Sequence, residues 1–188
     1  MHILTILGSP RKHGNTAQVL CQFEELATAQ RHTVERINIT DVKINGCLGC
    51  DSCFKRLDEP GCVQKDDLLP VLERILAADL VVYASPVYVW GFTAQIKALL
   101  DRHYCLVKWQ HGEIVSALMT GKPAALLLTC GGDAPGNLDL PQIAFTREMD
   151  YLRANLRGMY GLAEVESRED ARARGNEVAE QMAAEMLG

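Results

Sequence analysis

The first sixteen residues constrain the fold more strongly than any other part of the chain. Residues 2–7 are an apolar run rich in β-formers, and the loop 8–16 (Gly-Ser-Pro-Arg-Lys-His-Gly-Asn-Thr) follows it directly. Behind the loop, apolar residues such as Val19, Leu20 and Phe23 recur at helical steps. A strand that ends in such a loop and opens a helix is typical of a phosphate cradle. Backbone N–H groups and the positive end of the helix dipole then face the anion.

The spacing within this loop limits which phosphate ligand it suits. A nucleotide-hydrolysing P-loop has four residues between its two Gly and a Lys after the second. Here five residues separate Gly8 from Gly14, and Asn15 stands in place of the Lys. The dinucleotide pattern G-x-G-x-x-G is absent as well. The loop therefore suits one terminal phosphate. The alternative is an ordinary strand-to-helix turn with Asn15 as the N-cap, which accounts for Asn15 and Thr16 alone.

Composition and charge exclude several classes of protein. A chain of 188 residues has the usual size of one domain, and a net charge of −5 argues against nucleic acid as a partner. No apolar run approaches the roughly 18 residues of a membrane span, and the N-terminus lacks the pattern of a signal peptide. We expect a single cytoplasmic domain over residues 1–188 that binds neither nucleic acid nor membrane.

Strand and helix patterns alternate along the chain. The expected strands are 2–7, 33–38, 80–84, 124–129 and 159–165, and the expected helices are 15–29, 67–77, 93–106, 141–156 and 170–187. The runs 80–84 and 124–128 are apolar on both faces, as in parallel strands covered by helices on both sides. The sequence therefore predicts a three-layer α/β fold with a doubly wound, five-stranded parallel sheet in the order 2-1-3-4-5.

The helix expected over 93–106 carries one buried stripe, which consists of Phe92, Ile96, Leu99 and Leu100. We expect Arg102 to lie outside this stripe. His103 and His111 are expected at the surface or in an interface. The segment 108–120, with Trp109 and Ile114, is expected to be a surface excursion or a contact between subunits.

In a doubly wound sheet, the ligand lies at the carboxyl edge, so the loops after strands 1, 3 and 4 should carry the site. The loop 85–92 offers aromatic area, a rigid Pro and a Gly, and the loop 129–133 offers backbone N–H groups. Together they suit a flat heterocycle whose phosphate tail lies on the first loop. The alternative is partial core burial for Tyr88 and Trp90 and a simple turn for Gly131-Gly132.

Three motifs combine in this chain. The first is Gly8-Ser9-Pro10-Arg11 with Gly14-Asn15-Thr16, and the second is Ser85-Pro86-Val87-Tyr88 with Gly91 and Ala94-Gln95-Ile96-Lys97. The third is Cys47-x2-Cys50-x2-Cys53. Over residues 1–165 the chain resembles the flavodoxin-like NADPH-dependent FMN reductases, in particular the iron–sulfur flavoprotein branch. The resemblance implies a flavodoxin-like fold, bound FMN, NADPH or NADH as reductant, and a homodimer or homotetramer.

The resemblance also assigns residues to the cofactor. The first loop would hold the FMN phosphate, through Ser9, Arg11, Gly14, Asn15 and Thr16. The flavin ring would be lined by Pro86, Val87, Tyr88 and Gly91 on one side and by Thr129, Gly131 and Gly132 on the other. Because a flavin carries the hydride chemistry itself, we name no catalytic side chain.

The segment 41–67 is far longer than an ordinary connection and holds Cys47, Cys50, Cys53 and Cys62. Three cysteines at steps of three are ligands of a [4Fe–4S] cluster in ferredoxins. Eight residues separate Cys53 from Cys62, slightly more than the resemblance implies. Three interpretations stay open: a [4Fe–4S] cluster, a zinc site with four thiolates, and a metal-free loop.

Two classes of function remain open for the chain. The first is an NAD(P)H-dependent reductase that passes electrons through FMN to a flavin, a quinone or another small acceptor. The second is an iron–sulfur flavoprotein electron carrier that is reduced by ferredoxin. The sequence names neither the acceptor nor the choice between NADH and NADPH.

Overall fold

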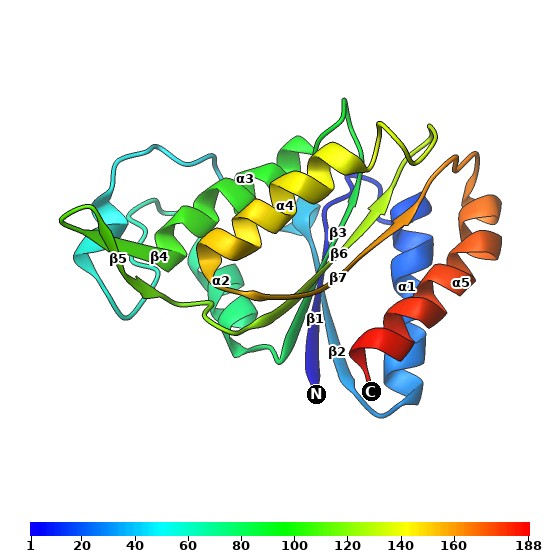
Figure 1. Cartoon of the computed structure of the whole chain (residues 1–188), viewed down its shortest axis with the longest axis horizontal. Coiled ribbons are helices and arrows are strands. Elements are labelled where there is room, and N and C mark those ends of the chain that lie inside the picture. Colours follow the sequence, from blue (N-terminus) through cyan, green and yellow to red (C-terminus); the bar gives the residue numbers. More distant parts are fainter.

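The computed structural model describes all 188 residues and centres on a five-stranded parallel sheet (Figure 1). The strands are β1 (His2–Leu7), β2 (Thr33–Asn38), β3 (Leu80–Pro86), β6 (Pro123–Thr129) and β7 (Asn155–Leu162). They lie in the order β2-β1-β3-β6-β7. Because β4 and β5 lie outside this sheet, the order equals 2-1-3-4-5 among its own strands, and the predicted flavodoxin-like fold class is confirmed.

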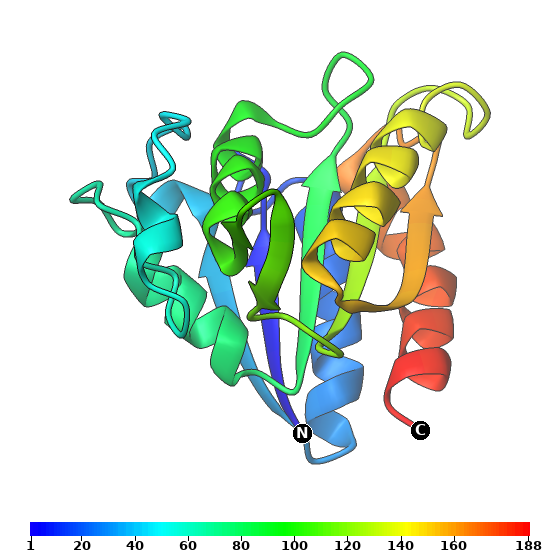
Figure 2. The same ribbon diagram turned by 60° about the vertical axis from the view of Figure 1, so that its left-hand side comes forward.

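Helices cover both faces of the sheet. One face is covered by α1 (Asn15–Ala29) and α5 (Arg168–Met186), and the other by α2 (Leu68–Ala77), α3 (Ala94–Arg102) and α4 (Asp139–Leu152). Figures 1 and 2 show the two helical layers on opposite sides of the strands. No helix has both the length and the hydropathy that crossing a bilayer requires.

Strand β1 shows how the sequence produces this layering. Leu4 and Ile6 belong to the core under α2–α4, whereas Ile3 and Leu7 belong to the core under α1 and α5. All four side chains are fully buried, as a strand between two helical layers requires. Burial on both faces is why the run has no alternation of apolar and polar residues.

Several boundaries differ from the prediction. Helix α3 ends at Arg102 and continues as a 3₁₀ turn over His103–Leu106, so the expected helix 93–106 changes type near its end. Helix α4 ends at Leu152, not at residue 156, because Arg153 adopts a left-handed φ of +56°. Strand β7 therefore begins at Asn155, four positions before the expected start at 159.

A hairpin that the sequence analysis missed stands beside the sheet. Strands β4 (Val107–Gln110) and β5 (Glu113–Ala117) pair antiparallel around a turn at His111-Gly112. Both turn residues have positive φ, +53° and +83°, as a two-residue hairpin turn requires. The segment 108–120, expected to be a surface excursion or a contact between subunits, thus contains regular structure. The segment 41–67, with a 3₁₀ turn at Ser52–Lys55, lies next to this hairpin at one end of the molecule (Figures 1 and 2).

Candidate functional site

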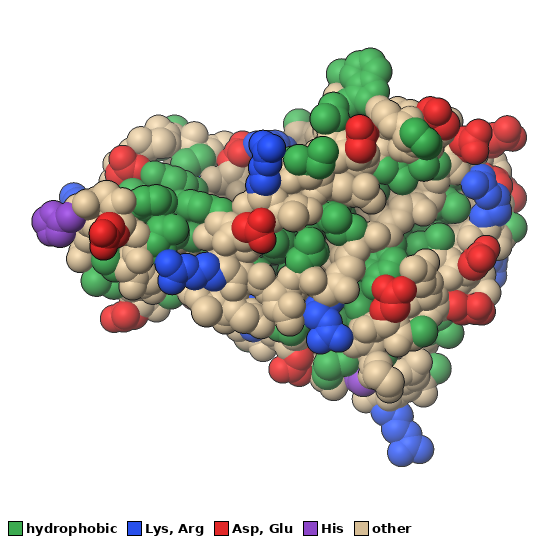
Figure 3. Space-filling view, in the orientation of Figure 1, with side chains coloured by type: hydrophobic (Ala, Val, Ile, Leu, Met, Phe, Trp, Pro, Cys, Tyr) green, Lys and Arg blue, Asp and Glu red, His purple; other side chains and the backbone are tan.

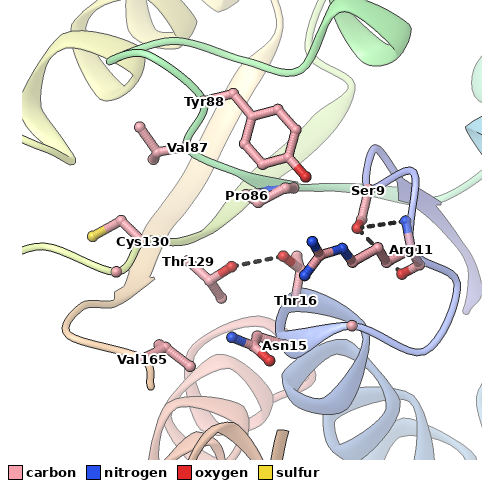
Figure 4. Close-up of a pocket in the computed structure, with 12 residues that line it drawn as sticks. Ser9, Arg11, Asn15, Thr16, Pro86, Val87, Tyr88, Thr129, Cys130 and Val165 are labelled. Carbon is pink, nitrogen blue, oxygen red and sulfur yellow. Dashed lines mark hydrogen bonds between the residues drawn. The ribbon is translucent and has the colours of Figure 1, made fainter. Parts of the chain in front are cut away.

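A cavity of about 160 Å³ opens at the carboxyl edge of the sheet (Figure 4). It is lined by Ser9, Arg11, Gly14, Asn15, Thr16, Pro86, Val87, Tyr88, Thr129, Cys130, Gly131 and Val165. These residues come from the loops after β1, β3, β6 and β7, so the loops predicted from the sheet order do meet. No carboxylate lines the cavity, which suits an anionic ligand.

The N-terminus of α1 leaves its backbone donors free at this cavity. Gly14 is the N-cap in an extended conformation, and no side chain caps the helix. No acidic residue stands in the first turn either. Asn15 is the first helical residue, so the alternative of an Asn15 N-cap is wrong. Free N–H groups and the positive end of the helix dipole together favour a bound anion.

Arg11 supplies a side-chain cation at the same end of the cavity. Its guanidinium takes part in no ion pair, whereas the neighbouring Lys12 is paired with Asp41. The backbone N–H of Arg11 donates to Ser9 Oγ over 3.1 Å, which fixes the turn that carries both side chains (Figure 4). Arg11 is thus the one cation of this loop that is free to meet a ligand.

A buried pair of hydroxyls forms the floor of the cavity. The Thr16 and Thr129 Oγ1 atoms lie 2.6 Å apart and share a hydrogen bond, with side chains that are 1% and 3% exposed. Thr16 belongs to α1 and Thr129 ends β6. The pair therefore links the phosphate-type loop to the opposite wall of the cavity.

The loop after β3 forms the other wall. The backbone N–H of Val87 donates to the Thr129 carbonyl over 2.8 Å and so extends the sheet pairing beyond Pro86. The Tyr88 side chain, which is 43% exposed, turns its phenol ring over the cavity (Figure 4). Together these residues offer a partly apolar surface at the open end.

A strained turn follows Tyr88. Tyr88 and Gly91 exchange two backbone hydrogen bonds of 2.9 and 3.0 Å, which close a two-residue turn over Val89 and Trp90. Both central residues have left-handed φ values, +48° and +58°. This conformation costs about 1–2 kcal/mol for a residue with a Cβ, and Val89 is β-branched. The turn nevertheless carries both apolar side chains outward, 89% and 58% exposed.

Gly8 has a different role from the one that the loop pattern indicates. A Cβ on Gly8 would lie 2.7 Å from Ile96 Cδ1, so the missing side chain allows α3 to approach the end of β1. Thr93, the N-cap of α3, donates to the Gly8 carbonyl in the same contact. Gly8 thus allows α3 to pack closely, and the backbone groups that can approach an anion belong to the residues that follow Gly8.

The four cysteines of the segment 41–67 share a second, smaller cavity. Cys47, Cys50, Cys53 and Cys62 line about 20 Å³ of space, with Cys47 and Cys50 exposed and Cys53 buried. Four thiols supply the donor set of a cluster or a zinc ion, and in this respect the residues fit. No three His, Cys, Asp or Glu side chains surround a common ion position in this structure. The structure thus brings the four candidate ligands to one cavity without forming a metal site.

Two other cysteines are not among the candidate ligands, although Cys105 also lines this cavity. Burial raises the pKa of Cys105 to about 12, so its thiol stays protonated in the core. Cys21 accepts a hydrogen bond from Arg36 over 3.1 Å on the far side of the sheet.

The expectation that Arg102 lies outside the buried stripe of α3 is wrong. Its side chain is 1% exposed and pairs over 2.8 Å with the carboxylate of Asp66, whose side chain is fully buried. The prediction of a surface position for His103 is also wrong. The ring is 1% exposed, and its Nδ1 lies 2.8 Å from Glu148 Oε1. Helical periodicity cannot reveal that a neighbouring segment covers a charged face.

The sequence model of the NADPH-dependent FMN reductase family matches residues 1–154. The chain belongs to this family. An iron–sulfur flavoprotein from Archaeoglobus fulgidus is 38% identical over 130 residues, which cover 65% of this chain and 57% of that protein. The chain spans about half the length of the curated relatives it matches. The predicted resemblance to the FMN reductases is confirmed.

Solved structures agree with this family on the fold. An FMN-dependent NADH-azoreductase from Bacillus anthracis in complex with FMN superposes with a TM-score of 0.74 over the full length of both chains, at 14% identity. An NAD(P)H:quinone oxidoreductase from Methanothermobacter marburgensis gives a TM-score of 0.72 at 18% identity and covers 97% of this chain and 96% of that one. At these identities the likeness shows the flavodoxin-like fold.

Most of the predicted cofactor residues of the FMN reductase site lie together in the cavity, but Gly91 and Gly132 do not line it. Gly91 closes the strained turn, and the backbone of Gly132 accepts from Glu164 N–H over 2.8 Å. Sequence reasoning missed Cys130 and Val165. Cys130 lies between two predicted residues and could have been included, whereas Val165 carries no signal of its own in the sequence.

Proposed function

We propose that this protein is an FMN-dependent oxidoreductase that takes electrons from a nicotinamide nucleotide and passes them to a small acceptor. The observation that carries the proposal is the cavity at the carboxyl edge, in which a free helix N-terminus and an unpaired cation meet an open aromatic wall. The flavin, when bound, supplies the hydride and electron-transfer chemistry. Membership in the FMN reductase family supports the assignment of that cofactor.

In this proposal, the chain's residues bind and orient the cofactor. The N–H groups at the start of α1 and the Arg11 guanidinium bind the terminal phosphate. The Ser9 hydroxyl holds the turn that presents Arg11, and the paired Thr16 and Thr129 hydroxyls form the floor beneath the phosphate. The loop 86–88 contacts one face of the ring, and the backbone after Thr129 meets its edge. The 160 Å³ cavity is smaller than the roughly 300–1,000 Å³ of typical ligand pockets, so it encloses only part of a cofactor of this size.

The first test is the absorption spectrum of the purified protein, recorded without oxygen before and after addition of NADPH and, separately, NADH. Flavin bands that bleach on addition of either nucleotide support the proposal. Flavin bands that bleach only with dithionite or reduced ferredoxin overturn the nicotinamide part. A colourless protein that does not bind added FMN overturns the whole proposal.

A second candidate function is an electron carrier with FMN and a [4Fe–4S] cluster, reduced by ferredoxin. The specific observation in its favour is the shared cavity of Cys47, Cys50, Cys53 and Cys62. The name of the Archaeoglobus fulgidus relative, an iron–sulfur flavoprotein, points the same way. About four iron and four sulfide per chain after anaerobic purification support this function. Zinc alone, or no metal, overturns it and leaves the reductase proposal intact.

We also propose that the active form is a homodimer or homotetramer. The strained turn leaves Val89 and Trp90 largely exposed beside the open end of the cavity, and in Figure 3 an apolar projection stands out at the top of the molecule. An apolar tip of this kind gains stability when a second chain covers it. Light scattering after size-exclusion chromatography tests the assembly, and a monomer at micromolar concentration contradicts it.

A further inference from the structure

Lys108 is an unusual side chain for a hairpin strand because it is completely buried. Its ammonium donates to three backbone carbonyls, those of Cys53 at 3.0 Å, Pro60 at 2.9 Å and Cys105 at 2.7 Å. Two of these carbonyls belong to the cysteine segment 41–67. The ammonium thereby uses all of its hydrogen-bond donors, yet no carboxylate lies within ion-pair distance of it.

Arg102 reaches the same segment from the end of α3. Its guanidinium donates to the Asn45 carbonyl over 2.8 Å, to Asp66 Oδ2 over 2.8 Å and to Cys62 Sγ over 3.1 Å. The contacts lie on both sides of the four cysteines along the chain. Together, Arg102 and Lys108 hold residues 45–66 against α3 and the hairpin.

When the four thiols of the segment are protonated, the buried charges around the cysteine cavity do not cancel. Two fully buried cations, Arg102 and Lys108, meet one fully buried carboxylate, Asp66, which leaves a net charge of +1. Asp51 also lines the cavity, but it is exposed and accepts from Tyr104. A buried charge without a counter-charge is costly, so a negative group is favoured at this place. Metal-bound thiolates are negative, and the four cysteines of the segment 41–67 that line the cavity would supply them.

We propose that Arg102 and Lys108 are positioning residues that form a cationic seat, which orders the cysteine segment and offsets the negative charge of its metal-bound thiolates. The inference rests on the second candidate function, in which the four cysteines hold a metal centre. The seat acts through charge as well as through hydrogen bonds, and this distinguishes it from a purely structural clamp. It also explains why a helix and a hairpin strand each bury a charged side chain.

The test uses the full-length, reduced, metal-free protein and Cd²⁺ as the probe, with thiolate-to-metal charge transfer as the signal. Lys108→Gln retains two N–H donors but loses the charge, and Arg102→Gln does the same for the guanidinium. Arg102→Lys keeps the charge. Arg36→Gln is the matched control, since Arg36 likewise donates to a carboxylate, Glu24, and a thiol, Cys21, but lies far from the segment. Limited proteolysis of residues 45–66 measures the order of the segment in each variant.

If the cationic seat acts through charge, Lys108→Gln and Arg102→Gln should bind Cd²⁺ at least about tenfold more weakly than wild type. Arg36→Gln should bind with wild-type affinity, and Arg102→Lys with an affinity near that of wild type. Protection of 45–66 that persists in Lys108→Gln, together with the loss of affinity, supports the charge role. Equal affinity in wild type and both Gln variants overturns it. A loss of both affinity and protection that Arg102→Lys does not restore also overturns it, in favour of a structural clamp. A wild-type protein that does not bind Cd²⁺ overturns the metal function itself.

Discussion

Neighbouring residues in the first loop differ in what they leave available for a ligand. Arg11 and Lys12 carry the same charge, yet Lys12 is held by Asp41 while the Arg11 guanidinium has no ion-pair partner. Ser9 turns its hydroxyl inward to the backbone of Arg11, which fixes the local turn. At this scale, binding capacity follows from which polar groups the fold has already paired and which it has left free.

We expect Arg11→Gln to weaken FMN binding by one to two orders of magnitude. A charge-assisted hydrogen bond to phosphate contributes about 1.5–3 kcal/mol, and each 1.4 kcal/mol corresponds to about a tenfold change in Kd. Quenching of flavin fluorescence on titration with flavin-free protein measures the affinity. Lys12→Gln is the matched control and should change Kd less than threefold, whereas equal effects of the two substitutions contradict the assignment.

The buried hydroxyl pair leads to a second prediction. Thr16→Val removes one member and leaves the Thr129 hydroxyl without a partner, which should lower the free energy of unfolding by about 1–3 kcal/mol. The double variant Thr16→Val/Thr129→Val removes both hydroxyls and should be closer to wild type than the single variant. Urea unfolding of the flavin-free protein measures both values. A double variant that is no more stable than Thr16→Val contradicts this argument.

At the scale of whole elements, the site depends on how strands and helices end. Helix α1 begins without a side-chain cap, and β3 runs into a strained turn. The turn over Val89 and Trp90 is the clearest case of a local conformation that its own residues disfavour. Backbone strain of this kind persists where a side chain is needed in a particular place.

Relief of that strain should increase stability at the expense of the site. Val89→Asn/Trp90→Gly places residues that tolerate positive φ in a two-residue hairpin turn, and we expect a gain of about 1–2 kcal/mol in the free energy of unfolding. The variant also loses its apolar tip, so the turnover with NADPH should fall. Thermal unfolding and NADPH oxidation assays measure the two effects. A stability equal to or below that of wild type contradicts the assignment of strain.

The cysteine segment is tied to the domain by the Asp66–Arg102 pair, and this contact makes its attachment sensitive to acid. Burial by itself raises the pKa of Asp66, but hydrogen bonds from Arg102 and from the backbone of Asn45 and Leu68 outweigh it and lower the pKa overall. A carboxyl with a lowered pKa stabilises the folded state above its unfolded pKa of about 3.9, and this stabilisation is lost as the pH falls through the folded value.

The corresponding prediction compares wild type with Asp66→Asn across pH. The variant should be clearly less stable near pH 7, and the difference between the two proteins should shrink as the pH falls below about 4, where Asp66 itself becomes protonated. Urea unfolding at a series of pH values measures the difference. A difference that stays constant down to the acid limit shows that the carboxylate charge contributes nothing.

For the molecule as a whole, the predictable part of the fold was the layered sheet. Runs such as 80–84 are apolar on both faces, and this property alone places them between helices. The hairpin escaped prediction because its strands are short and His111-Gly112 is a weak turn signal. The burial of Arg102 and Lys108 could not be read from local periodicity. It depends on contacts with Asp66 and Cys53, which are 36 and 55 positions away.

Cofactor binding should stabilise the entire domain, since the cavity joins loops from four strands. A ligand present at 100 times its Kd adds about 2.7 kcal/mol to the free energy of unfolding when it binds only the folded state. For a chain of 188 residues this corresponds to a rise in Tm of about 5–10 °C. Differential scanning fluorimetry with added FMN measures the shift, with riboflavin, which lacks the phosphate, as the control. Equal shifts with both compounds contradict a site built around the phosphate.

The contact between Lys108 and the carbonyls of Cys53 and Pro60 has a consequence for how related sequences evolve. The hairpin and the cysteine segment are far apart in the gene, but each satisfies polar groups that the other would otherwise bury unpaired. When a homologue has lost either the hairpin or the cysteine segment, selection no longer keeps the remaining one unchanged. Among homologous chains, we therefore expect the cysteines and the lysine to be gained and lost together. Sequences without the four thiols should carry an uncharged residue at the position of Lys108 or lack the hairpin altogether.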